Sequence, residues 1–134
     1  MAKIIAPSAR TTLYNGVHGN QSVAVLGASL AAAAAGDVVV LGEFDGHPTI
    51  TDFRLDHANL GAGTSVDIGF AYSSTTADEP DVIADGLATA SAGSKRMAQK
   101  PVEAKEKFCQ VVATVKGGTA TGELSLTLGY TNRG

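Results

Sequence analysis

The strongest constraint on the fold is a strict alternation of apolar and polar residues that follows a glycine-rich segment. Between residues 65 and 72, alternate side chains fall on opposite sides of an extended backbone. This period of two is typical of a strand that is buried on one side only. The two sets are Val66, Ile68, Phe70 and Tyr72 on the apolar side, and Ser65, Asp67, Gly69 and Ala71 on the other.

The segment before the glycines alternates in the same way. Phe53, Leu55 and His57 are interleaved with acidic and basic residues, and Gly61-Ala62-Gly63 supplies a chain reversal. Strand, glycine turn and strand together predict a β-hairpin over residues 49–72. We expect the remaining strands to pack around this hairpin.

Further strands are predicted on both sides of it. A second hairpin is expected to close the chain, with its turn at Gly117-Gly118. The run Ala31 to Ala35 is read as a turn or a single helical turn, because it is too short for a stable helix. Residues 95–107 are charged and contain Pro101, which favours a solvated connection, with a short helix possible at either end. The predicted strands cover residues 22–30, 37–44, 82–90, 108–116 and 122–130.

Short strands at this spacing, separated by glycine-rich turns, predict an all-β fold, a jelly-roll-like β-sandwich of about seven or eight strands. Residues 22–134 are expected to form a single domain. Residues 1–21 are expected to form an extended N-terminal arm with one edge strand near Thr11 to Tyr14. The arm is either a partly ordered terminus or a segment that orders on a partner.

A chain of 134 residues most simply makes one domain with a real core. Cys109 is the only cysteine, so no intrachain disulfide forms, which fits a reducing compartment. No apolar run approaches the roughly 20 residues of a membrane-spanning helix, and the first residues lack the apolar run of a secretory signal. We therefore expect a soluble product made in a cytoplasm, without a membrane partner.

Charge is unevenly distributed along the chain, although the formal net charge is only −3. Between Asp37 and Asp85, ten acidic residues accompany a single base, Arg54. From Lys95 onward, seven bases accompany three acids. This pattern indicates either pairing within the molecule or complementary contacts between subunits. Nucleic acid is not expected as a partner, because there is no strong basic stripe and few aromatic residues could stack on bases.

Candidate chemical sites are weak. His18, His47 and His57 lie among Asp45, Asp52 and Asp56, but the spacing does not force these groups to converge on a metal. Asp56, His57 and Ser65 have the residue types of a catalytic triad without its motif. Cys109 lies in an apolar strand and is read as a small buried hydrophobe. We expect no enzyme activity, no catalytic residues, no metal and no cofactor.

Several segments carry a resemblance to a known family. They are KIIAPSARTTLYNGVHGN from residue 3, AAAAAGDVVVLGEF from residue 31, HPTITDFRLDHANLGAGTSVDIGFAY from residue 47 and ADGLATASAG from residue 84. Together they span residues 3 to 93. The chain resembles the head decoration, or cement, proteins of tailed bacteriophages.

The resemblance implies a jelly-roll subunit that is present in many copies on the outer surface of a virion. Such a subunit would bind the major capsid protein at capsomer junctions and stabilise the capsid, and it would form a symmetric dimer or trimer. Lys3 and Arg10, the bases of the arm, are the candidate partner-binding residues. Removing residues 1–12 is expected to weaken attachment and to leave the fold intact.

Two alternative functions remain open. One is a tail or adsorption component with a carbohydrate-binding β-sandwich, which would expose aromatic rings to sugars. Tyr72 and Tyr130 are expected to face the core, which leaves Tyr14 as the exposed tyrosine. The other alternative is a hydrolase or metal enzyme that depends on His57.

Overall fold

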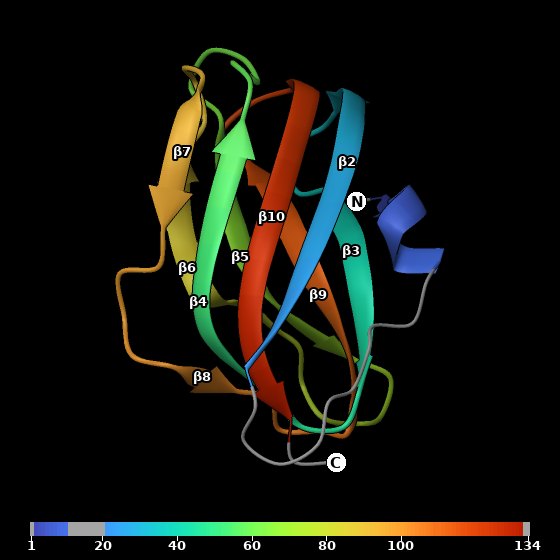
Figure 1. Cartoon of the computed structure of the whole chain (residues 1–134). Helices are drawn as coiled ribbons and strands as arrows, with labels where there is room; N and C mark the ends of the chain where they lie inside the picture. The colour runs from blue at the N-terminus through green and yellow to red at the C-terminus, as the bar shows by residue number, and fades with distance from the viewer. Residues whose placement is uncertain (1, 11–20, 133–134) are drawn as a thin grey trace.

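The computed structural model describes residues 2–10 and 21–132, which form two β-sheets packed face to face (Figure 1). Sheet A has the strand order β1-β3-β9-β5-β6, and sheet B the order β2-β10-β4-β7, with β8 also paired to β4. One 3-10 turn, η1, follows β1. The elements are β1 (Lys3–Ile5), η1 (Pro7–Arg10), β2 (Ser22–Ala33), β3 (Val38–Asp45), β4 (Pro48–His57), β5 (Ser65–Tyr72), β6 (Glu79–Ala88), β7 (Gly93–Arg96), β8 (Val102–Glu103), β9 (Phe108–Lys116) and β10 (Ala120–Asn132).

The all-β sandwich is confirmed, and its seven long strands overlap the strand segments predicted from the sequence. The core lies between the sheets, where the apolar faces of β5 and β10 meet those of their neighbours. Phe44 of sheet A packs edge to face on Tyr130 of sheet B, with ring centroids 4.8 Å apart. Val66, Ile68, Phe70 and Tyr72 all belong to this core, as the period of two predicted.

Both predicted hairpins are wrong in their pairing. Strands β4 and β5 do not hydrogen-bond to each other: β4 lies in sheet B beside β10, whereas β5 lies in sheet A between β9 and β6. In the same way β9 belongs to sheet A and β10 to sheet B. Each glycine turn therefore carries the chain across the core from one sheet to the other.

The two glycine turns lie against each other at one end of the sandwich. A Cβ on Gly61 would come within 2.8 Å of the carbonyl oxygen of Thr119, and a Cβ on Gly117 would overlap the carbonyl oxygen of Gly63. Main-chain bonds extend this contact, from the amide of Thr121 to the oxygen of Leu60 at 2.9 Å. Glycine is needed at these turns because two backbones approach closely, and not because the strands pair.

Strand β5 is buried on both faces, in contrast to the one-sided burial expected. Asp67 and Gly69, which point away from the core, are buried as well. The backbone of Glu79 and Pro80 crosses directly over Gly69, where a Cβ would collide with it. The Asp67 carboxylate accepts a hydrogen bond from the amide of Gly86 at 2.8 Å. Strand β6 and its bulges thus cover part of the outer face of sheet A.

Two predicted connections differ from the structure. Strand β2 continues to Ala33, past the start of the turn expected over residues 31–35, and Ala32 has a positive φ of 52°. Residues 95–107 contain the end of β7, all of β8 and no helix. This segment is also less solvated than expected, because Ala104 is buried in the core and Gln99 donates to the carbonyl oxygens of β6.

The described N-terminal residues lie along the body. Strand β1 pairs in parallel with β3, and Ala6 enters the core. The Ser8 hydroxyl group donates to the carbonyl oxygen of Leu41 at 2.6 Å and also bonds Gly27 of sheet B, so η1 bridges the two sheets. These contacts argue against the expectation that removing residues 1–12 leaves the fold intact. The predicted strand near Thr11 to Tyr14 lies outside the described residues, and the division into arm and body stays a prediction.

Candidate interaction surfaces

The predicted metal ligands are dispersed. His47 lies in the connection between β3 and β4, and His57 lies at the end of β4, whereas His18 is outside the described residues. Within residues 2–10 and 21–132, no group of three or more His, Cys, Asp or Glu side chains could hold a metal ion. His57 is only 7% exposed, and its Nδ1 bonds the carbonyl oxygen of Ala58 at 3.0 Å.

The triad-like residues do not form a triad. The Asp56 carboxylate accepts hydrogen bonds from Ser94 and from Arg54 Nε, and these bonds lower the pKa of Asp56. His57 bonds the main chain instead of Asp56, and Ser65 lies in the other sheet. The three side chains therefore cannot pass a proton from one to the next.

The interpretation of Cys109 as a buried hydrophobe is confirmed. The side chain is 4% exposed, and burial raises the pKa of the thiol to about 12. A thiolate is the nucleophilic form, so the group is inert at neutral pH. Tyr72 and Tyr130 are buried as expected. The Tyr72 hydroxyl group donates to Glu79 at 2.6 Å, and burial and this bond raise the pKa of Tyr72.

Ion pairs within the molecule resolve part of the charge asymmetry. Four ion pairs join an acid of the middle section to a base of the C-terminal section. Three of these acids are part-exposed, so each of those pairs contributes little stability. The four pairs are Arg96–Asp52 at 3.6 Å, Lys105–Glu79 at 3.3 Å, Lys107–Asp45 at 4.0 Å and Lys116–Asp67 at 3.6 Å.

The two partner-binding candidates both lie in the N-terminal segment. Lys3 is exposed on β1, and Arg10 ends η1, with its side chain outside the described part. Lys3 borders a hollow of about 360 Å³ that also includes Glu43, Asp78 and Phe108. Here Lys3 is brought near acidic groups and an exposed aromatic ring.

Phe108 is the surface residue that sequence reasoning missed. Its ring is 58% exposed, and the ammonium group of Lys107 lies 5.8 Å from the ring centre. One signal was available in the sequence. Phe108 is out of phase with Cys109, Val111 and Ala113, which face the core, so it shares the outward face with Gln110.

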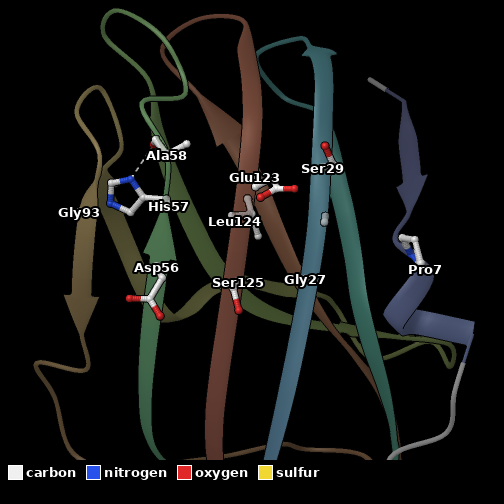
Figure 2. A pocket seen from close by; sticks show the side chains of 11 residues that line it. Pro7, Gly27, Ser29, Asp56, His57, Ala58, Gly93, Glu123, Leu124 and Ser125 are labelled. Carbon is white, nitrogen blue, oxygen red and sulfur yellow. Dashed lines mark hydrogen bonds between the residues drawn. The ribbon is translucent and has the colours of Figure 1, made fainter.

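A larger, open hollow of about 560 Å³ lies on the outer face of sheet B (Figure 2). Small residues of β2 and β10 form its floor, including Gly27 and Ser125, and the end of β4 forms one side through Asp56 and His57. The surface is broad and lacks a converging set of reactive groups. It is suited to contact with another macromolecule rather than to turnover of a small substrate.

No helix in the described part of the chain is long and apolar enough to cross a membrane.

Two solved structures resemble this fold. One is a chain in the capsid of Ralstonia phage GP4, with a TM-score of 0.78 and 20% identity over 98% of both chains. The second is a chain of the cyanophage Pam1 capsid asymmetric unit, with a TM-score of 0.59, 17% identity, and coverage of 90% of this chain and 93% of that one. No protein-family model matches the sequence, and no curated protein matches it. The fold is thus one that occurs in phage capsids.

Proposed function

We propose that this chain is a structural protein of a phage virion that decorates the outer surface of the head. In this role it binds the major capsid protein at capsomer junctions and holds neighbouring capsomers together. It is made in the cytoplasm of the bacterial host and acts without catalysis, cofactor or metal. The observation that carries the proposal is the end-to-end likeness to a chain of a phage capsid.

The physical properties of the body support this role. The strands of both sheets are tied together at their ends by close backbone contacts and by buried hydrogen bonds, such as the one between Thr64 and Thr89 at 2.9 Å. A rigid subunit loses little conformational entropy on binding. Many copies on one shell also gain by avidity, so each contact can be weak.

We assign the partner contact to the N-terminal segment and its surroundings. Lys3 and Arg10 are the bases of this segment, and the four ion pairs described above occupy four of the bases elsewhere in the chain. An electrostatic contact through these two bases would orient the subunit on an acidic surface more than it would strengthen binding. Phe108 and its hollow supply an apolar anchor near Lys3.

Co-sedimentation with undecorated phage heads tests the assignment. Because residues 2–10 pack on the body, charge reversal is a sharper perturbation than truncation. The double variant Lys3→Glu with Arg10→Glu should bind heads at least about tenfold more weakly, with the loss reduced at high salt. Lys100→Glu, in the connection between β7 and β8, is the matched control and should bind as wild type. Full-strength binding by the double variant would remove the N-terminal segment from the interface.

The exposed ring of Phe108 favours one alternative, a carbohydrate-binding role in a tail or in adsorption. A ring that is 58% exposed beside Gln110 and Glu43 could stack on a sugar. A glycan-array signal that Phe108→Ala abolishes, together with no binding to heads, would favour this role over decoration.

A further inference from the structure

The sandwich has four sheet edges among its described strands, and three of them are poorly suited to further pairing. Strand β6 carries Asp81 and Asp85, and two of its carbonyl oxygens accept hydrogen bonds from Gln99. Strand β7 has four residues, two of them basic, and β1 has three, including Lys3. Short length and charge are the usual means of protecting an edge.

The edge formed by β2 is different. This strand has 12 residues and contains no charged side chain. Val23 is 66% exposed and Val25 is 69% exposed, and both stand on the outer face of sheet B. A long, apolar, uncharged edge strand is the kind that pairs with another chain.

The backbone of β2 also offers hydrogen-bonding groups at this edge. The amide of Gly27 and its carbonyl oxygen both bond the Ser8 hydroxyl group, at 3.3 Å and 3.2 Å, so they point away from β10. In an antiparallel ladder, alternate residues direct both backbone groups to the same side. Val23 and Val25 therefore direct theirs to the open edge. Among the described residues, only Ser8 bonds the backbone of this edge, and it does so at Gly27, which follows both valines along the strand.

We propose that the edge of β2 pairs antiparallel with β2 of a second copy of this chain. Val23 of one copy lies opposite Val25 of the other, and each facing pair exchanges both of its hydrogen bonds. The twofold axis passes beside Ala24, and the four valines form one apolar patch on the outer face of a sheet that is continuous across both copies.

The absence of charged side chains on β2 favours a second copy of this chain as the partner of this edge. A twofold contact places the same edge against itself, so an edge whose charges are all of one sign repels its copy. The two aspartates of β6 would repel their copies, whereas β2 has no charge to repel. Cross-strand pairs of β-branched residues are also among the favourable pairs in antiparallel sheets. This inference rests on the β2 edge alone and does not depend on the virion role.

Substitutions at Val25 test the pairing, with sedimentation equilibrium as the measurement over a range of protein concentration. Val25→Pro removes an amide that faces the open edge and leaves the β10 ladder intact. Val25→Lys places like charges across the axis. Each variant should weaken dimerisation by at least about tenfold, or abolish it. Ser29→Lys, on the same face of β2 but beyond the Ser8 contact at Gly27, is the control and should dimerise as wild type.

Backbone protection gives an independent readout. Amide hydrogen exchange at Val23 and Val25 should slow as the wild-type concentration rises, while exchange at exposed amides of β6 should not change. A wild-type protein that stays monomeric up to about millimolar concentration would overturn the proposal. A dimer that survives Val25→Pro unchanged would overturn it too. So would a trimer, because antiparallel pairing of one edge with itself closes at two copies.

Discussion

The contact between the two glycine turns makes a quantitative prediction about Gly117. This residue has a φ of 79°, and a Cβ placed on it would overlap the carbonyl oxygen of Gly63. Gly86 is a matched control, because its φ is 72° and no heavy atom lies within 4 Å of the position its Cβ would take. Both alanine variants suffer the left-handed backbone strain, and only Gly117→Ala also suffers the collision.

The two costs can be separated by their sizes. Left-handed strain on an alanine costs about 1–2 kcal/mol, which is the whole effect expected for Gly86→Ala. Forcing an extra methyl group into a packed contact adds about 1–3 kcal/mol, so Gly117→Ala should lose about 2–5 kcal/mol. The entropy that alanine removes from the unfolded chain is the same in both variants and cancels in the comparison.

Urea unfolding followed by circular dichroism measures the difference. With a slope of about 1–3 kcal/mol per molar urea, the midpoint for Gly117→Ala should lie roughly 1 M below that for Gly86→Ala. Equal midpoints for the two variants would refute the reasoning, because they would show that the turns do not lie in contact.

Three further outcomes follow from buried or bonded polar groups. Asp37 accepts hydrogen bonds from two main-chain amides at 3.0 Å, and these bonds lower the pKa of Asp37 below the ordinary 3.8. The stability advantage of wild type over Asp37→Asn, measured by urea titration, should therefore persist above pH 4 and shrink as the pH falls further. The Thr64 hydroxyl group hydrogen-bonds both Gly61 and Thr89. Thr89→Val should therefore lose about 1 kcal/mol of unfolding free energy, and Thr64→Val should lose more. The reverse order would contradict these two hydrogen bonds. Cys109 should react with a thiol reagent at pH 8 far more slowly in the folded protein than in urea, and equal rates would contradict its burial.

The charge pattern shows how far the sequence constrained the candidate surfaces. An acidic middle and a basic C-terminal section predicted either internal pairing or subunit contacts, and the structure forms internal pairs such as Lys116–Asp67. Features of the surface that a partner could contact include Lys3, the exposed Phe108 and the uncharged edge of β2. Neither Phe108 nor that edge was identified from the pattern, because exposure of a strand residue depends on which strands lie beside it.

The sequence by itself determined where the strands run and which of their faces meet the core. Alternation at Val66, Ile68, Phe70 and Tyr72 was sufficient for this, because the side-chain period of a strand is a local property. Only the tertiary structure decided which strands pair. Every strand offers the same backbone donors and acceptors at its edges, so local sequence cannot distinguish a neighbour in one sheet from a partner across the core. The turns at residues 61–63 and 117–118 therefore looked like hairpin turns, and they cross between sheets because their glycines allow the two backbones to pack together.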